Sequence, residues 1–157
     1  MNYVIWSQTP DETHNVGKRL GSLLKRGDVL ALYGELGAGK TALAQGIASA
    51  LGVAEQVISP TYTLIHEYSA WSEGELLKLI HMDLYRLQYP EEAEIIGVGD
   101  VLQGDTIGLI EWPEIGEDLL PVDRLTIKIE GAGDVPRKII FSAVASEWEE
   151  RLKELEQ

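Results

Sequence analysis

A glycine-rich segment that begins at residue 34 carries the residue types that hold phosphate groups in proteins. It fits the pattern G-x-x-x-x-G-K-[ST] at every specified position, with the residues Gly34, Glu35, Leu36, Gly37, Ala38, Gly39, Lys40 and Thr41. Glycines permit positive φ angles and a close approach of phosphate, so that successive backbone N–H groups can point into one concavity. Lys40 would place its charge between the β- and γ-phosphates, and Thr41 would offer a hydroxyl to Mg²⁺. The segment therefore predicts a P-loop for a nucleoside triphosphate, and ATP hydrolysis as its chemistry.

Magnesium-dependent hydrolysis also needs a carboxylate close to the phosphates, and two acidic residues are candidates. Asp83 directly follows the largely apolar residues 79–82, and Glu111 follows the apolar residues 108–110. Ligand sites in α/β sheets are built at the carboxyl ends of strands, which is where both side chains would lie. The spacing alone favours neither of them as the metal ligand.

The residues around the P-loop predict the strand and helix that such a loop requires. A continuous apolar run at residues 29–33 is typical of a strand buried on both faces. After the loop, Leu43, Ile47 and Leu51 recur at helical spacing as far as Gly52. The order strand, glycine-rich turn, helix is the context in which this motif binds phosphate.

The N-terminal segment predicts one further strand and helix. Residues 2–6 form the expected strand, and Thr9 and Pro10 then supply an N-cap and the first helical position. Apolar residues at helical spacing continue to Leu24, so the helix is expected to end at Gly27.

The rest of the chain predicts a hairpin, a short helix, a buried strand and a second strand pair. The ranges are 63–68 with 76–82, 90–96, 106–110, and 124–130 with 137–144. Ser146 is expected to cap a polar C-terminal helix that is exposed on one side. The pattern contains no repeat and no linker, which predicts one α/β domain over residues 1–157.

Composition excludes several classes of protein. Thirteen basic residues against 26 acidic ones give a formal net charge of -13, without the basic stripe that nucleic-acid binders display. Any RNA in its pathway is therefore expected to be held by a partner. Cysteine is absent, no apolar run approaches the roughly 20 residues of a membrane span, and residues 1–6 do not resemble a secretory signal. We expect a cytoplasmic protein without disulfides.

Four motifs together resemble the TsaE (YjeE) family, bacterial ATPases needed to make threonylcarbamoyladenosine on tRNA. They are the P-loop, Ser-Pro-Thr-Tyr-Thr at residues 59–63, His-Met-Asp-Leu-Tyr-Arg-Leu at residues 81–87 and Ile-Glu-Trp-Pro-Glu at residues 110–114. They occur in the family's order and spacing, and the resemblance covers nearly the whole chain. It implies an α/β, P-loop NTPase-like sheet of mixed parallel and antiparallel strands, flanked by helices.

The resemblance also implies roles for individual residues. Thr41 and Glu111 would ligate Mg²⁺, and Asp83 would polarise the attacking water or hold a metal-bound water. Thr61 would be a switch element near the γ-phosphate, catalytic together with Lys40 and Asp83, and Trp112 a functional aromatic beside the site. The implied ATP contacts are Glu35, Leu36, Gly37, Ala38, Gly39, Lys40, Thr41 and Ala42, with Trp6, Thr9 and Arg137 near adenine. At position 42 many relatives carry a second threonine, so Ala42 puts one phosphate contact in doubt.

Plainer interpretations of several of these residues remain. Thr61 could begin an ordinary strand after proline, and Trp112 could be a core tryptophan. Arg86 could be an arginine finger or, more simply, a salt-bridged residue at a strand end. The three histidines, His14, His66 and His81, have no metal-ligand spacing and are expected to pack in the core or on the surface.

The resemblance implies a TsaB–TsaD pair as partner, with TsaD performing the transfer and ATP hydrolysis resetting the complex; tRNA would be met only through these partners. Three other functions are alternatives to this one. A small-molecule kinase usually brings a lid with clustered arginines, which the sequence lacks. A GTPase needs an Asn-Lys-x-Asp motif, whereas the only asparagines are Asn2 and Asn15. An assembly factor that binds ATP with little turnover of its own is not distinguished by the sequence.

Overall fold

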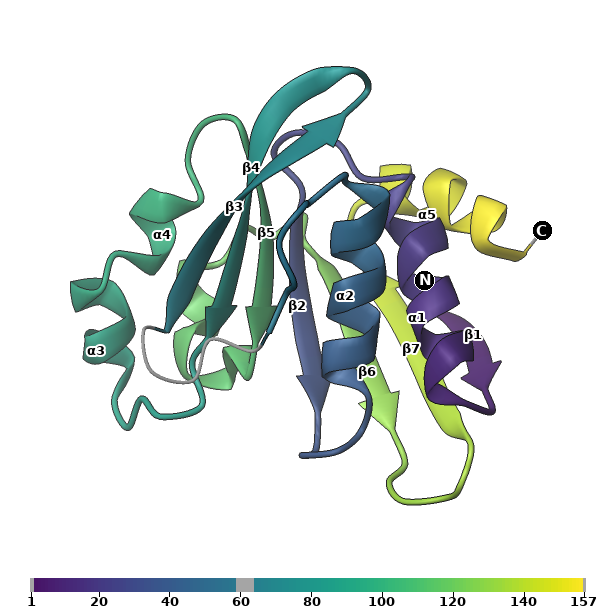
Figure 1. Ribbon diagram of the computed structural model, residues 1–157. Coiled ribbons are helices and arrows are strands. Elements are labelled where there is room, and N and C mark those ends of the chain that lie inside the picture. The colour runs from purple at the N-terminus through teal and green to yellow at the C-terminus, as the bar shows by residue number, and fades with distance from the viewer. Residues whose placement is uncertain (1, 59–63, 157) are drawn as a thin grey trace.

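A seven-stranded mixed sheet runs through the part of the chain that the computed structural model describes, residues 2–58 and 64–156 (Figure 1). The strands stand in the order β1-β7-β6-β2-β5-β4-β3. Their bounds are β1 (Asn2–Ser7), β2 (Val29–Gly34), β3 (Ile65–Ser72), β4 (Glu75–Asp83), β5 (Thr106–Glu111), β6 (Leu125–Glu130) and β7 (Arg137–Ala143). The central strands β6, β2, β5 and β4 are parallel, whereas β1, β7 and β3 pair antiparallel with their neighbours. The α/β fold with a mixed sheet is thereby confirmed.

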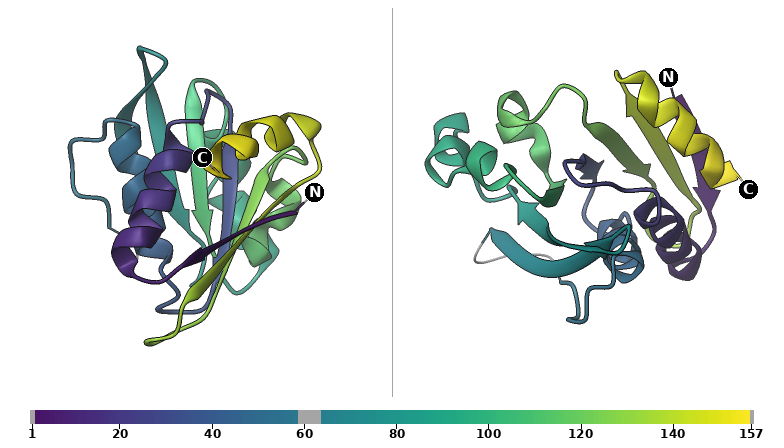
Figure 2. Two further views of the ribbon diagram at one scale, coloured as in Figure 1. Left: turned by 90° about the vertical axis from the view of Figure 1, so that its right-hand side faces the viewer. Right: turned by 90° about the horizontal axis from the view of Figure 1, so that it is seen from above.

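Helices cover both faces of this sheet, and the strands β2 and β5 at its centre are apolar along most of their length. The helices are α1 (Pro10–Gly21), α2 (Lys40–Ala50), α3 (Pro90–Ile95), α4 (Val98–Val101) and α5 (Ser146–Leu152), with the 3₁₀ helices η1 (Pro113–Leu119) and η2 (Lys153–Glu156). One core cluster joins the sheet to α1, α2, α5 and η2, and the other joins it to α3, α4 and η1. Figure 2 shows the sheet and the helices on its two faces from the side and from above. All six residues of β5 are buried, as expected of a strand covered on both faces.

Close contact between α1 and α2 fixes the helix that carries the P-loop at its start. A Cβ atom added at Gly46 would lie 2.0 Å from the carbonyl oxygen of His14, and one added at Gly17 would lie 2.3 Å from that of Leu43. Only glycine allows two helix backbones to approach so closely. The position of α2, and with it the geometry of the loop before it, therefore depends on small residues at this interface.

The start of α1 confirms the predicted cap, but its end does not lie where the sequence placed it. Thr9 has extended backbone angles, and its hydroxyl accepts a hydrogen bond of 3.1 Å from the Glu12 N–H. The helix ends at Gly21 instead of at Gly27. Leu23 and Leu24 then donate to carbonyls three residues back, so the chain continues in turns that keep an apolar spacing without being an α-helix.

The predicted hairpin is confirmed, with β3 and β4 longer than expected and joined at Glu73 and Gly74, which both have positive φ angles. The start of the predicted first strand, residue 63, lies outside the described residues. The prediction for Ser146 is wrong: the N-cap of α5 is Ala145 and Ser146 is its first helical residue. The elements α4 and η1 were not predicted. No helix in the described part of the chain is long and apolar enough to cross a membrane.

The helix contact leads to a prediction about stability. Gly46→Ala adds the Cβ that meets the His14 carbonyl, and overpacking of this kind costs about 1–3 kcal/mol. The gain in helix propensity, about 1 kcal/mol, offsets only part of that cost. We therefore expect a lower free energy of unfolding, measured by urea denaturation followed by circular dichroism. Ser49→Ala, on the exposed side of the same helix, is the control and should change stability by no more than about 0.5 kcal/mol. A Gly46→Ala protein as stable as the wild type would contradict the packing argument.

Candidate nucleotide-binding site

The P-loop connects the end of β2 to the start of α2, as the sequence predicted. Gly37 and Gly39 have φ angles of 80° and 112°, in the region that favours glycine. Gly39 is also the N-cap of the 11-residue helix α2, with Lys40 and Thr41 as its first residues. The loop and the helix N-terminus thus place backbone N–H groups where phosphate oxygens would bind.

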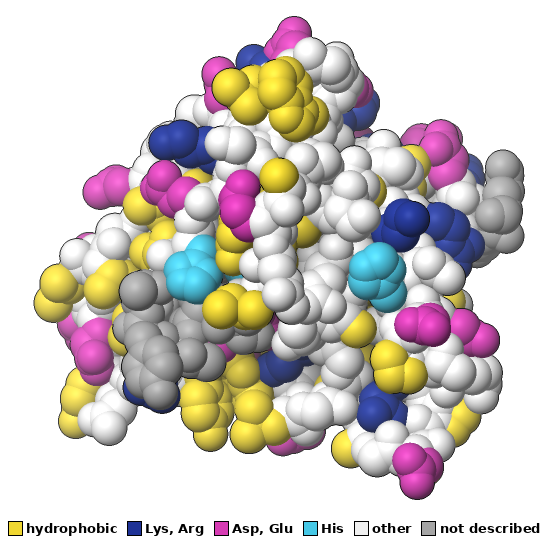
Figure 3. All heavy atoms as spheres, viewed as in Figure 1, with side chains coloured by type: hydrophobic (Ala, Val, Ile, Leu, Met, Phe, Trp, Pro, Cys, Tyr) yellow, Lys and Arg dark blue, Asp and Glu magenta, His cyan; other side chains and the backbone are white. Residues whose placement is uncertain are grey.

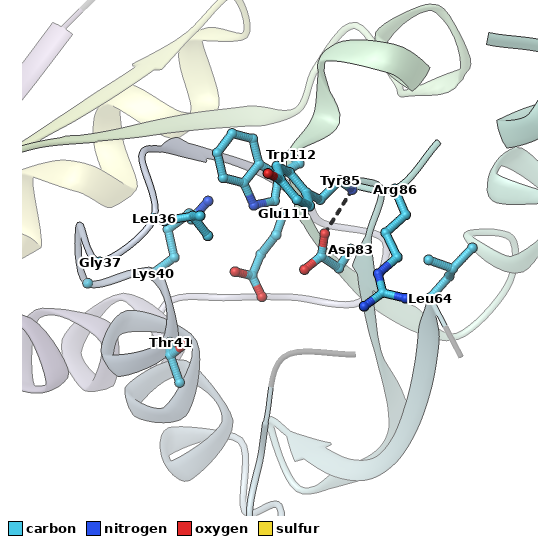
Figure 4. Close-up of a pocket in the computed structure, with 11 residues that line it drawn as sticks. Leu36, Gly37, Lys40, Thr41, Leu64, Asp83, Tyr85, Arg86, Glu111 and Trp112 are labelled. Carbon is cyan, nitrogen blue, oxygen red and sulfur yellow. Dashed lines mark hydrogen bonds between the residues drawn. The ribbon is translucent and has the colours of Figure 1, made fainter. Parts of the chain in front are cut away.

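A cavity of about 430 Å³ opens beside this loop. Its walls come from the P-loop, from the residue before β3 and from the carboxyl ends of β4 and β5 with the residues that follow them. The lining residues are Leu36, Gly37, Gly39, Lys40, Thr41, Leu64, Asp83, Tyr85, Arg86, Glu111 and Trp112. Figure 4 shows Lys40, Glu111 and Asp83 directed into the same space, with Arg86 on the opposite wall. The fold therefore brings the P-loop together with both carboxylates that the sequence put forward.

The Lys40 side chain reaches back along the loop and is only 6% exposed. Its ammonium donates a 2.6 Å hydrogen bond to the carbonyl oxygen of Gly34 and lies 3.5 Å from the centre of the Trp112 ring. Burial lowers the pKa of Lys40, and the negative charges of Glu111 and Asp83 act in the opposite direction. The lysine is thus placed within the cavity by contacts on two sides.

Asp83 and Glu111 lie side by side in the register of the parallel strands β4 and β5. An oxygen of Asp83 accepts a 2.9 Å hydrogen bond from the Tyr85 N–H, whereas Glu111 is 2% exposed and bonds to His81. Burial raises the pKa of Asp83; the hydrogen bond from Tyr85 lowers it, and Glu111 adds to the rise. Two neighbouring carboxylates in unlike surroundings can take different chemical roles.

His81 is the site residue that the sequence argument missed. Its Nε2 atom lies 2.6 Å from Oε2 of Glu111, and the side chain is 1% exposed. The burial of His81 agrees with the expected core position. Its ring also does more than pack, because it contacts a carboxylate that lines the cavity. The available signal was the strand pattern, because His81 and Asp83 are two residues apart and so share one face of β4. His66 bonds to Tyr68 at 3.2 Å and His14 is half-buried, in line with the packing interpretation.

Trp112 lies at the edge of the cavity and belongs to neither core cluster among the described residues. Its φ angle is 52°, which is unfavourable for a residue with a side chain. Its ring centre is 4.8 Å from that of Tyr85, on the side away from the P-loop. The core interpretation of this tryptophan is therefore wrong, and it stands between Lys40 and a surface tyrosine.

The residues expected near adenine do not line the cavity beside the P-loop. Arg137, on β7, donates from Nε to the Ala38 carbonyl at 2.9 Å and from Nη2 to the Gly37 carbonyl at 3.2 Å. Trp6 is 58% exposed on the edge strand β1, and the Thr9 side chain caps α1; neither lines the cavity. Thr61 lies outside the described residues. Arg137 thus reaches the outer side of the P-loop backbone, and its contact with a base stays a prediction.

Oxygen atoms suited to magnesium are present in the cavity. Within the described residues, no group of three or more His, Cys, Asp or Glu side chains forms a metal site. The hydroxyl of Thr41 and the carboxylates of Glu111 and Asp83 nevertheless line the same space. Mg²⁺ is commonly held by one or two protein oxygens together with phosphate oxygens and water. The donor set therefore fits a magnesium ion that binds with a nucleotide.

The strand–loop–helix unit and the strand-end carboxylates beside it define a protein of the P-loop class. Comparison with known proteins narrows this class further. The sequence pattern of the family described as "Threonylcarbamoyl adenosine biosynthesis protein TsaE" matches residues 7–139, and the chain belongs to that family.

Individual relatives agree with this placement. The chain is 42% identical over 146 residues to the tRNA threonylcarbamoyladenosine biosynthesis protein TsaE of Bacillus subtilis, covering 93% of this chain and 89% of the relative. It is 39% identical over 128 residues to the protein of that name from Haemophilus influenzae, covering 77% and 78%. The crystal structure of Bacillus subtilis YdiB is similar with a TM-score of 0.78 and 35% identity, over 99% of this chain and 95% of that one. The resemblance drawn from four short motifs is thereby confirmed.

The contacts of Arg137 lead to a prediction about nucleotide affinity. Arg137→Ala removes the charged hydrogen bonds to the P-loop carbonyls, each worth about 1.5–3 kcal/mol. If the P-loop becomes less ordered and part of this free energy is lost, the affinity for nucleotide should fall roughly tenfold, which corresponds to about 1.4 kcal/mol. Because the contact is to the loop, fluorescent ATP and GTP analogues should lose affinity in parallel. Lys128→Ala removes an equal charge from an exposed position on β6 and is the control. A loss confined to the ATP analogue would instead support contact with adenine.

Proposed function

We propose that this chain is a magnesium-dependent ATPase required for the threonylcarbamoyladenosine modification of tRNA. The observation that carries the proposal is that Lys40 of the P-loop, Asp83 and Glu111 line one and the same cavity. Membership of the TsaE family supports the pathway. The P-loop supports a nucleotide as ligand, and the two carboxylates support its hydrolysis.

The P-loop residues would bind the polyphosphate. Backbone N–H groups between Gly37 and Thr41 would donate to phosphate oxygens, aided by the positive potential at the start of α2. Lys40 would move its ammonium from the Gly34 carbonyl to the β- and γ-phosphates. The glycines at positions 37 and 39 allow this approach because they carry no side chain.

Thr41 and Glu111 would hold Mg²⁺, which supplies charge neutralisation for the phosphates when it is bound. Asp83 would accept a hydrogen bond from the attacking water. As the water oxygen bonds to the γ-phosphorus, the bond from that phosphorus to the β–γ bridging oxygen breaks and ADP leaves with the bonding electrons. The released proton would pass from the water toward Asp83. Burial raises the pKa of Asp83 and so makes its carboxylate a better proton acceptor.

Two other functions compete with this proposal. A small-molecule kinase would need several arginines around the transferred phosphate, and Arg86 is the single arginine among the described residues that line the cavity. A nucleotide-dependent assembly factor with little intrinsic turnover would use the same contacts. Turnover measured alone and with a TsaB–TsaD complex separates that function from a partner-stimulated ATPase.

Replacing the P-loop lysine tests the nucleotide site itself. Lys40→Ala removes the ammonium from the cavity, and a charged hydrogen bond of this kind is worth about 1.5–3 kcal/mol. We expect ATP affinity to fall roughly 10- to 100-fold and turnover to be abolished, measured by titration with a fluorescent analogue and by phosphate release. Lys128→Ala serves again as the charge-matched control. Unchanged affinity and turnover in the Lys40 variant would refute the P-loop assignment.

A further prediction concerns the partner. If the nucleotide state alters Trp112 and its neighbours, docking on a TsaB–TsaD complex should differ between an ATP analogue, ADP and no nucleotide. Coupling between two binding sites is typically about 1–3 kcal/mol, or about 5- to 150-fold in affinity. Calorimetry in the three states measures it directly. Equal affinity in all three would refute the switch, since a ligand shifts an equilibrium only through differential binding.

Free tRNA provides the negative control for that experiment. The net charge is -13, and on the face shown in Figure 3 the basic side chains lie scattered among acidic ones. The isolated chain should therefore not bind tRNA measurably at physiological salt. Tight binding would mean that the RNA is not held by partners alone.

A further inference from the structure

A buried hydrogen bond joins His81 to Glu111, which lines the nucleotide cavity. The two side chains are 1% and 3% exposed, and the atoms Nε2 and Oε2 are 2.6 Å apart. On β4, His81 pairs with Leu109 of β5, and two residues further along the strand Asp83 pairs with Glu111. Histidine and glutamate are therefore diagonal neighbours on one face of the sheet. A hydrogen bond to a carboxylate that is buried away from solvent is strong and directional.

The second ring nitrogen of His81 indicates on which nitrogen the proton of this hydrogen bond lies. Nδ1 is buried and has no hydrogen-bond partner within the part of the chain that the structure describes. A proton there would be an unsatisfied buried donor, which costs about 1–3 kcal/mol. An ionised carboxylate can only accept hydrogen bonds, so the proton between the two residues sits on Nε2. The geometry thus places a proton on Nε2, which donates it to Glu111, whereas Nδ1 has no hydrogen-bond partner among the described residues.

We infer that His81 is a positioning residue for magnesium. Its Nε2–H holds one oxygen of Glu111 and so fixes the orientation of this carboxylate. Figure 4 shows the Glu111 side chain directed into the cavity. The inference rests on the proposed function, in which Glu111 ligates the metal. A glutamate fixed in advance loses less side-chain freedom when the ion binds. Partners of metal-ligating groups typically contribute 10- to 100-fold to metal affinity or activity, in the way proposed here.

Two substitutions separate positioning from simple packing. His81→Leu fills the buried space but cannot donate to Glu111, whereas His81→Gln carries an amide that can donate from nearly the place of Nε2. His66→Leu is the matched control, because His66 pairs with His81 across β3 and β4 but bonds to Tyr68. Glu111→Gln removes the proposed metal ligand itself.

The experiment measures the affinity of a fluorescent ATP analogue as a function of Mg²⁺ concentration, and again in EDTA. In His81→Leu the half-saturating Mg²⁺ concentration should rise about 10- to 100-fold, with affinity in EDTA within about twofold of the wild type. His81→Gln should recover most of the Mg²⁺ response, and His66→Leu should retain all of it. Loss of affinity in EDTA as large as that in Mg²⁺, or an equal effect in His66→Leu, would overturn the inference in favour of packing.

Glu111→Gln distinguishes failure of this inference from failure of the proposed function. If it abolishes the Mg²⁺ response while His81→Leu keeps it, the metal ligand stands and the positioning role is wrong. If Glu111→Gln keeps the response, the proposed metal site is wrong. Nitrogen-15 correlation spectra of the wild-type histidines test the position of the His81 proton even if the His81→Leu protein does not fold. The Nε2–H pattern for His81 is expected, assigned by its absence from the His81→Gln spectrum, and an Nδ1–H pattern would overturn the inference.

Discussion

The parallel pairing of β4, β5 and β2 is the constraint on which the site depends. This register sets Asp83 beside Glu111 and Glu111 beside Leu32, two residues before the P-loop begins. Parallel strands end at the same edge of the sheet, so residues far apart in the sequence meet there without any long side chain reaching across. The glycine contact between α1 and α2 then sets the helix against this edge, which brings Lys40 to the two carboxylates.

The electrostatics of the cavity follow from this arrangement. Lys40, Asp83 and Glu111 are all buried, and burial disfavours the charged forms of Lys40 and Asp83. It lowers the pKa of Lys40 and raises that of Asp83, whereas attraction between the lysine and the carboxylates works against both shifts. Such charges are tolerated because they are close together and hydrogen-bonded, to Gly34, Tyr85 and His81. A site of this kind is organised for additional charges of both signs, as a metal–nucleotide complex would bring.

The sequence predicted what depends on local pattern. The P-loop, the apolar strands and the hairpin all follow from turn residues and periodicity within short windows. The end of α1 was misplaced because Leu23 and Leu24 keep an apolar spacing in turns, and α4 has only four residues, too few for a periodic signal.

The sequence could not supply contacts that depend on register or on distant chain segments. His81 meets Glu111 across 30 residues, and Arg137 meets the P-loop across 99. No local pattern records such pairings, because they depend on which strands are neighbours and by how much they are offset. The family resemblance named Glu111 and Arg137 as residues of interest, but not the side chain that supports the first or the backbone that the second holds.

Trp112 connects the P-loop lysine to an exposed tyrosine through contacts for which a bound phosphate would compete. The Lys40 ammonium is held by both Gly34 and Trp112, and phosphate oxygens that bind it would compete with those two contacts. On its other side the tryptophan packs on Tyr85, which is 56% exposed. The helix η1 begins directly after Trp112, and its Glu117 accepts a hydrogen bond from Tyr33 on β2, the strand that leads into the P-loop. The Trp112 end of this segment therefore contacts the P-loop, and its Glu117 end contacts the strand that leads into the loop. A displacement of Lys40 would act first on this tryptophan and next on an exposed tyrosine, which gives the proposed coupling between nucleotide and partner a contiguous physical route.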